Sequence, residues 1–175
     1  ADVLEIDLHK LIEDEFQGME VVVCANLPYY ITSPVIMKLL EEKLPISAIT
    51  VMVQKEAAQR ICAEVGSRES GAVTVSVNYY AQPQMLFSVS AGSFMPAPKV
   101  DSCVIRLDVS SEPTVSVIDD KSFFRVVKGA FAQRRKTLSN SMSSSMGIDK
   151  LNLHTEAGCN RAMDLLDDAL HYVTQ

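Results

Sequence analysis

Residues 20–34 read Glu20-Val-Val-Val-Cys-Ala-Asn-Leu-Pro-Tyr-Tyr-Ile-Thr-Ser-Pro34, and they decide the fold class of this chain. The run from Glu20 to Ala25 is β-branched and carries no charge after Glu20, which predicts a strand buried on both faces of a mainly parallel sheet. The segment Asn26 to Tyr30 ends that strand. Ser33 and Pro34 are typical of a helix N-cap followed by the first helical residue, so we expect a helix to come next.

The same alternation continues along the chain. A second buried strand is predicted at Ile46 to Val53, and helix-forming residues follow from Gln54 to Glu64. Three further segments are read as strands, at Ala72 to Tyr80, Met85 to Val89 and Ser102 to Leu107. Strands without an intervening helix pair antiparallel. The sequence therefore predicts an α/β fold whose sheet is parallel at its centre and antiparallel at its edge.

A polar stretch from Ser110 to Val117 separates this part from a helical tail. One apolar helical stripe is formed by Phe123, Val127, Ala130 and Phe131, and a last helix is expected between Ala162 and Val173. We therefore predict two domains, residues 1–110 with the sheet and residues 111–175 as a small all-α domain.

Length and composition exclude several classes of protein. With 175 residues, 47% of them apolar, the chain is large enough to bury a core and too apolar to be disordered. No apolar run approaches the length of a membrane span, and acidic residues near the N-terminus argue against a signal peptide, so a cytoplasmic location and no membrane partner are expected. The cysteines are widely spaced with no Cys-x-x-Cys pair and have apolar neighbours, which favours buried thiols over disulfides or a metal site: Cys24, Cys62, Cys103 and Cys159.

Charge is distributed unevenly. Residues 121–146 hold six cations and no Asp or Glu, and because the whole chain has a net charge of −6, the remainder carries −12. A local basic face of this kind can bind nucleic acid in spite of the acidic total.

Three segments are candidates for a functional site. Asn26-Leu-Pro-Tyr29 directly follows a buried strand, and strand ends are where open α/β sheets bind ligands. Phe94-Met-Pro-Ala-Pro-Lys-Val-Asp-Ser102 places an aromatic residue before a stiff Pro-x-Pro loop, and Phe131-Ala-Gln-Arg-Arg-Lys-Thr-Leu-Ser-Asn140 carries the densest basic cluster. Taken singly, each has a structural explanation: a strand-to-helix turn, a rigid connection and a solvated helix end.

Together the three segments resemble the ribosomal RNA adenine dimethyltransferases of the KsgA/Dim1 family, and more specifically its bacterial branch. Residues 26–34 resemble the family's catalytic motif, residues 52–60 the helix that follows, residues 94–102 its base-stacking loop and residues 131–140 its signature in the helical domain. The resemblance implies a Rossmann-like methyltransferase sheet and a helical domain that binds rRNA. It also implies transfer of methyl groups from S-adenosylmethionine to N6 of two adjacent adenines in 16S rRNA during maturation of the small ribosomal subunit.

Under this hypothesis the motif residues acquire specific roles. The exocyclic amine of adenine is a poor nucleophile, because its lone pair is delocalised into the ring. The side-chain carbonyl of Asn26 and a main-chain carbonyl at Leu27 or Pro28 would accept its two N–H bonds and favour a pyramidal nitrogen. Tyr29 and Phe94 would stack on opposite faces of the extruded base. No metal is required.

The remaining roles concern the cofactor and the RNA. Asp2 matches the family's aspartate near the cofactor adenine, so Asp2 and Asn26 are the expected cofactor-binding residues. Arg134, Arg135 and Lys136 have no neighbouring acid to pair with, and we expect them to bind phosphates of the rRNA backbone.

One departure from the family is large. The Gly-rich loop and the ribose-binding acid of the family's first half have no counterpart here, so the chain is expected to be a fragment that is itself inactive and prone to non-native self-association along an open sheet edge. Two alternatives remain open. The chain could belong to a ribosome-assembly factor that acts mainly by contact with pre-rRNA, or, more remotely, to an N6-adenine DNA methyltransferase.

Overall fold

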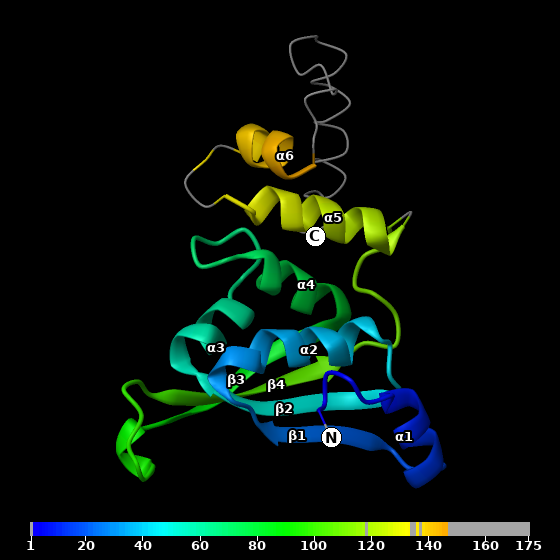
Figure 1. Cartoon of the computed structure of the whole chain (residues 1–175), viewed down its shortest axis with the longest axis vertical. Coiled ribbons are helices and arrows are strands. Elements are labelled where there is room, and N and C mark those ends of the chain that lie inside the picture. The colour runs from blue at the N-terminus through cyan, green and yellow to red at the C-terminus, as the bar shows by residue number, and fades with distance from the viewer. Residues whose placement is uncertain (1, 118, 134–135, 137, 147–175) are drawn as a thin grey trace. The chain divides into compact units, whose positions relative to one another are not determined.

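The computed structural model describes residues 2–117, 119–133, 136 and 138–146 (Figure 1). The helix predicted between Ala162 and Val173 therefore lies outside the described residues, as do Cys159, Arg134 and Arg135. The chain divides into two units, residues 1–114 and residues 115–175.

The first unit is built on a four-stranded sheet. Its strands are β1 (Val21–Asn26), β2 (Ile46–Gln54), β3 (Ala81–Val89) and β4 (Ser102–Val109), arranged in the order β1-β2-β4-β3. β1 and β2 are parallel, whereas β4 is antiparallel to both β2 and β3. The mixed sheet confirms the predicted α/β class. Among the described strands the parallel pair lies at one end of the sheet rather than at its centre.

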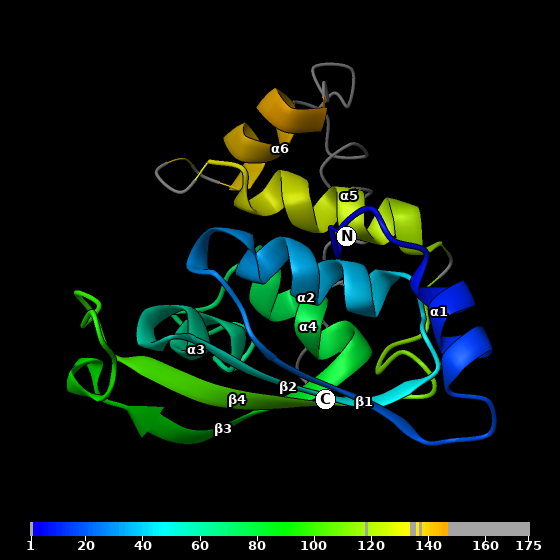
Figure 2. The same ribbon diagram turned by 60° about the horizontal axis from the view of Figure 1, so that its bottom comes forward.

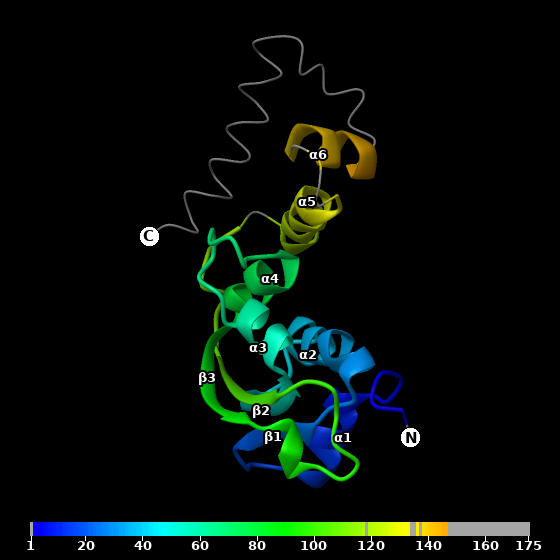
Figure 3. The same ribbon diagram turned by 90° about the vertical axis from the view of Figure 1, so that its left-hand side faces the viewer.

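Three helices cover one face of this sheet, as Figure 2 shows: α2 (Thr32–Glu41), α3 (Lys55–Ile61) and α4 (Ala72–Tyr80). The core lies between these helices and the sheet, where Ile36 of α2, Val77 of α4, Ile49 of β2 and Ile105 of β4 are fully buried. Figure 3 shows β3 and β4 curving beneath the helices.

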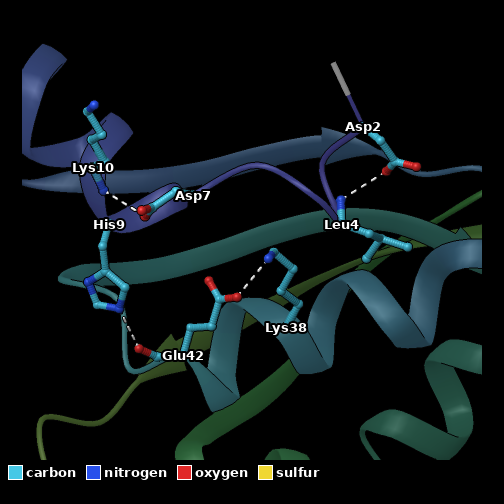
Figure 4. A network of polar contacts seen from close by, with 7 residues as sticks. All are labelled: Asp2, Leu4, Asp7, His9, Lys10, Lys38 and Glu42. Atoms are coloured by element: carbon cyan, nitrogen blue, oxygen red, sulfur yellow. Dashed lines mark hydrogen bonds and ion pairs between the residues drawn. The ribbon is translucent and has the colours of Figure 1, made fainter.

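The N-terminal segment contains the first helix, α1 (Leu8–Glu15). Asp7 is its N-cap, and the Asp7 carboxylate accepts a hydrogen bond from the Lys10 N–H at 3.0 Å. Nε2 of His9 lies 2.8 Å from the Glu42 carbonyl oxygen, just beyond the end of α2, and Lys38 forms an ion pair with the Glu42 carboxylate at 2.7 Å (Figure 4). The His9 contact joins α1 to the end of α2, and the ion pair lies within that end.

The prediction that residues 20–25 are buried on both faces is wrong. Burial alternates along β1, and Val22 is 59% exposed because no described helix covers that face of the sheet. The predicted burial of the thiols fails for the same reason at Cys24, which is exposed on β1, whereas Cys103 on β4 is buried and Cys62 is intermediate.

The segment 72–80 is a helix, α4, and not the predicted strand. Its β-branched residues suggested a strand, but Thr74, Val77 and Tyr80 recur at helical spacing and are all buried. The Gly71 N–H donates to Thr74 Oγ1 at 2.9 Å, and this hydroxyl donates to the Arg60 carbonyl at 2.7 Å. Tertiary burial of one helical face therefore outweighs the local propensity.

Two further boundaries differ from expectation. A 3-10 helix, η1 (Tyr29–Ile31), precedes α2, which begins at Thr32, so Ser33 is a helical residue and not the N-cap. β3 begins at Ala81 and continues through Pro83, whereas the predicted strand began at Met85. Pro83 is tolerated because β3 lies at the edge of the described sheet, where a missing N–H leaves no ladder bond unmade.

The second unit contains α5 (Asp120–Phe131) and α6 (Leu138–Met146). Asp119 caps α5 by accepting the Ser122 N–H at 2.8 Å, and hydrogen bonds from the Ser122 hydroxyl and N–H lower the pKa of the Asp119 carboxyl. The buried Ser141 hydroxyl of α6 donates to the Gly129 carbonyl of α5 at 2.8 Å. Of the predicted apolar stripe, Val127 is buried as expected, whereas Phe131 is exposed and Phe124 is buried instead. None of the helices in the described ranges combines the length and apolar character that a membrane span requires.

Candidate functional site

A cavity of about 320 Å³ lies at the carboxyl ends of β1 and β2, where the sequence places its strand-end motif. Small-molecule sites start at about this volume. The lining residues are Asn26, Leu27, Pro28, Tyr29, Met52, Phe94, Pro96 and Pro98. The structure thus brings the Asn26–Tyr29 motif and Phe94 together, although 65 positions separate Phe94 from Tyr29 in the sequence.

The strand and the turn position the motif. Asn26 is the last residue of β1, stands opposite Met52 in the parallel register, and has an exposed side chain. Leu27 is 9% exposed and anchors the turn in the core. Pro28 then leads into η1, which presents the Tyr29 ring to the cavity.

The two main-chain carbonyls proposed as acceptors, those of Leu27 and Pro28, differ in the hydrogen bonds that they already accept. The Pro28 carbonyl accepts the Ile31 N–H at 3.1 Å and the Thr32 hydroxyl at 3.3 Å. Within the described part of the chain, no hydrogen bond to the Leu27 carbonyl is found. Because a carbonyl oxygen has two lone pairs, Pro28 has no acceptor capacity left and Leu27 does. The acceptor pair favoured by the structure is therefore the Asn26 amide oxygen and the Leu27 carbonyl.

Aromatic residues form two parts of the cavity wall. The Tyr29 ring is 41% exposed, and its hydroxyl oxygen lies 3.2 Å from the hydroxyl oxygen of Ser102, a residue that is 1% exposed. Phe94 is half-buried and follows a short 3-10 helix, η2 (Ala91–Ser93), in the loop between β3 and β4. Figure 1 shows this loop at the end of the sheet where α2 begins.

Sequence analysis missed one lining residue, Met52, and assigned no roles to Pro96 or Pro98. A signal for Met52 was present, since adjacent parallel strands end at the same edge of a sheet and Met52 lies near the end of β2. The hydrogen bond between Tyr29 and Ser102 joins segments 73 positions apart and had no signal in the sequence.

Asp2, the other predicted cofactor residue, does not line this cavity. Its side chain is exposed, and Oδ1 accepts the Leu4 N–H at 2.9 Å in an N-terminal turn (Figure 4). The cavity therefore unites the predicted base-binding residues and Asn26 but not Asp2.

Only one of the three predicted phosphate-binding cations lies within the described residues. Lys136 is exposed, whereas Arg134 and Arg135 are outside those residues. The structure adds three exposed cations at helical spacing on α5, Lys121, Arg125 and Lys128, which share one face of that helix. Sequence analysis counted these residues in the basic region but gave them no role.

Two thiols of the first unit, those of Cys62 and Cys103, are poor nucleophiles near neutral pH. Burial, with a smaller contribution from Cys103, raises the pKa of Cys62 to about 11. Burial also raises the pKa of Cys103, against the opposing effects of Lys55 and a hydrogen bond from Ser88. Both thiols stay protonated, and neither lines the cavity. No cluster of three or more metal-binding side chains occurs among residues 2–117, 119–133, 136 and 138–146.

Two larger concave regions, of about 550 and 580 Å³, lie near the amino ends of β1 and β2. They share Val21 and Pro45 and contain none of the predicted site residues. The smaller cavity is therefore the candidate site, because it is at the carboxyl edge and collects residues from three separate segments.

Comparison with solved structures identifies the class of this fold. The chain superimposes on the crystal structure of a dimethyladenosine transferase from Plasmodium falciparum with a TM-score of 0.65 and 26% identity, covering 92% of this chain and 55% of the other. The 23S rRNA methyltransferase ErmE gives a TM-score of 0.54 at 24% identity, which shows a shared fold. The fold is that of the rRNA adenine methyltransferases.

Residues 1–172 match the family model described as ribosomal RNA adenine dimethylase, and the chain belongs to this family. It is 52% identical over 143 residues to ribosomal RNA small subunit methyltransferase A of Alkaliphilus oremlandii, covering 82% of this chain and 50% of that protein. The protein of the same name from Caldanaerobacter subterraneus subsp. tengcongensis is 49% identical over 153 residues, 87% of this chain and 56% of the relative. The chain thus spans about half the length of the curated relatives it matches.

Proposed function

We propose that this chain supplies the base-binding and catalytic part of a cytoplasmic enzyme that dimethylates N6 of two adjacent adenines in 16S rRNA during maturation of the small ribosomal subunit. The observation that carries the proposal is the single cavity shared by Asn26, Tyr29 and Phe94. Membership of the adenine dimethylase family supports the same reaction class. Residues 1–110 would be the second half of the methyltransferase domain and residues 111–175 a helical rRNA-binding domain.

Each wall of the cavity has a part in this reaction. An adenine drawn out of its stack would lie between the Tyr29 and Phe94 rings, since aromatic faces bind any base by stacking. Its amino group would donate one hydrogen bond to the Asn26 amide oxygen and the other to the Leu27 carbonyl. Two acceptors so placed would localise the lone pair on the nitrogen and orient it for methylation. A bound methyl donor would supply the methyl group, whose bond to sulfur would break as its bond to nitrogen forms, and the amine would lose one proton to solvent.

The methyl donor we propose is S-adenosylmethionine, whose sulfonium supplies an electrophilic methyl group when bound. The described residues fit this donor in part. The exposed Asn26 amide stands at the strand end, and the exposed Asp2 carboxylate keeps one oxygen, Oδ2, outside its hydrogen bond to Leu4. Asp2 and Asn26 are therefore the residues through which this chain would hold the donor.

Backbone phosphates of the rRNA are the proposed partners of the basic residues. Lys136 and the α5 face of Lys121, Arg125 and Lys128 are exposed, and no acid occurs between residues 121 and 146. Lysine and arginine bind RNA phosphates by charge, which positions the substrate without selecting the base. We extend the same role to Arg134 and Arg135.

The test uses a full-length form, meaning this chain joined to a segment equivalent to the half of the relatives' length that it does not span. Small ribosomal subunits that lack the modification are incubated with radiolabelled S-adenosylmethionine, and the labelled nucleosides are identified by chromatography. We expect N6,N6-dimethyladenosine in 16S rRNA. Tight binding to the subunit without methyl transfer would contradict the proposal and favour the assembly-factor alternative.

A further inference from the structure

We propose that Asp101, directly before β4, and Ser102, the first residue of β4, are positioning residues that together set the placement of the Tyr29 and Phe94 rings. This inference rests on the proposed function and deepens it by naming what holds the base-binding walls in place. Neither residue lines the cavity itself.

Ser102 acts on the Tyr29 side of the cavity. Its hydroxyl lies 3.2 Å from the Tyr29 hydroxyl, and it is 1% exposed, whereas the Tyr29 ring is 41% exposed. Ser102 is also fixed on both sides within the sheet, opposite Gln54 of β2 and Val89 of β3. A buried hydroxyl fixed within the sheet thus holds the outer end of the more exposed Tyr29 side chain.

Asp101 acts on the Phe94 side. Its carboxylate Oδ1 accepts the Ala91 N–H at 2.9 Å, at the first residue of η2 and three positions before Phe94. Its carbonyl accepts the Lys55 N–H at 3.0 Å, at the start of α3. The Asp101 side chain therefore links the two ends of the 91–101 loop, and the Asp101 carbonyl connects this loop to the residue that follows β2.

Both contacts come from the same short segment, because residues 101 and 102 are adjacent in the chain where β4 begins. A displacement at this point would move both rings together, whereas removal of one side chain would release one ring only. Pre-organised walls matter for a stacked base, since misplacement of a positioning group lowers the rate without removing any group that touches substrate.

The first experiment reads ring position directly. The full-length form is labelled with carbon-13 in its tyrosine and phenylalanine rings, and the Tyr29 and Phe94 signals are assigned from the Tyr29→Phe and Phe94→Leu variants. Ser102→Ala should shift the Tyr29 signal, and Ser102→Thr, which keeps a hydroxyl, should restore it. Asp101→Ala should shift Phe94, and Asp101→Asn, which keeps an acceptor oxygen, should largely restore it. Unmoved signals in both alanine variants would overturn the inference.

The second experiment is a double-mutant cycle on kcat/KM for 16S rRNA methylation. We expect Ser102→Ala and Tyr29→Phe each to lower kcat/KM about fivefold, the factor that corresponds to about 1 kcal/mol for one hydrogen bond. Since both changes remove the same hydrogen bond, combining them should cost no more than either alone. A purely structural role for Ser102 would give multiplied decreases instead. Ser76→Ala is the matched control, because Ser76 is a buried serine on α4 outside the cavity.

The outcomes separate this inference from the proposed function. If the unsubstituted full-length form does not methylate rRNA and the ring signals respond as expected, the function fails and the positioning stands. If methylation occurs and the signals and the cycle do not respond, the positioning fails and the function stands. Should Ser102→Ala not fold, Tyr29→Phe removes the same hydrogen bond from the exposed side and takes its place in the kinetic measurement, where an unchanged kcat/KM would overturn the role of Ser102.

Discussion

Asn26 and Met52 stand opposite each other in the parallel register of β1 and β2, and both side chains line the cavity at the carboxyl edge of the sheet. The register places the polar amide and the apolar thioether on the same face, next to the Leu27 turn. A base in this cavity would thus meet an acceptor on one strand and an apolar surface on its neighbour, which suits a planar purine that has a polar edge.

Replacement of Asn26 tests the catalytic role. In the full-length form, Asn26→Ala should lower kcat for adenine methylation by about a hundredfold or more, since one of two acceptors that orient the amine is removed. Affinity for the small subunit should stay nearly unchanged, because phosphate contacts dominate binding. Asn78→Ala is the matched control: Asn78 lies on α4 and donates to the Thr74 carbonyl. Full methylation by the Asn26→Ala enzyme would remove Asn26 from the mechanism.

Phe94 provides a test of stacking. Phe94→Leu should lower kcat/KM by roughly tenfold, within the range of 1–3 kcal/mol for a base on an aromatic ring, whereas Phe94→Tyr should keep most of the activity. The control is Phe87→Leu, because Phe87 on β3 is 59% exposed and does not line the cavity. Equal decreases in the Phe94→Leu and Phe87→Leu enzymes would show that the effect does not arise from stacking in the cavity.

The basic face of α5 has a measurable electrostatic signature. Replacing Lys121, Arg125 and Lys128 together by Gln should weaken binding to rRNA and reduce the slope of log K against log salt by between two and three, about one for each phosphate that is no longer neutralised. Binding is followed by filter retention of labelled 16S rRNA at several salt concentrations. A matched triple replacement of Lys10, Lys43 and Arg68, exposed residues of the first unit outside the 94–102 loop, should leave the slope unchanged. An unaltered slope in the α5 variant would place the RNA-binding surface elsewhere.

Periodicity and strand-end position predicted the mixed sheet and the residues gathered in the cavity, because both depend on short-range pattern and a general topological rule. Residues 72–80 were misread for a physical reason: β-branched residues favour a strand locally, and only burial of Thr74 and Val77 against the sheet makes the helix the better solution. The exposure of one face of β1 could not be predicted either. An uninterrupted apolar run indicates a strand buried on both faces, but it does not show whether helices cover both of them. Long-range hydrogen bonds such as that between Tyr29 and Ser102 have no local pattern at all.

Thr74 offers a stability test of the helix that sequence analysis missed. Thr74→Val keeps the shape of a fully buried side chain but removes the hydroxyl that accepts from the Gly71 N–H and donates to the Arg60 carbonyl. We expect the free energy of unfolding to fall by about 1–3 kcal/mol, because two backbone groups at part-buried hydrogen bonds lose their partners. Urea denaturation measures the change. Thr50→Val on β2, a half-buried threonine, should alter stability by much less, and equal effects would contradict this account.

The uncovered face and edge of β1 predict association of the isolated 175-residue chain. Val22 is 59% exposed and Cys24 is exposed on this face, while β1 pairs with β2 alone among the described strands. An apolar surface beside an open edge favours pairing with a second copy, which light scattering after size exclusion would detect as dimers or larger species. Val22→Lys should shift the chain toward the monomer, because a charged side chain on an edge strand opposes pairing. Val100→Lys, at an exposed loop position, is the control, and a monomeric unsubstituted chain at high concentration would contradict the prediction.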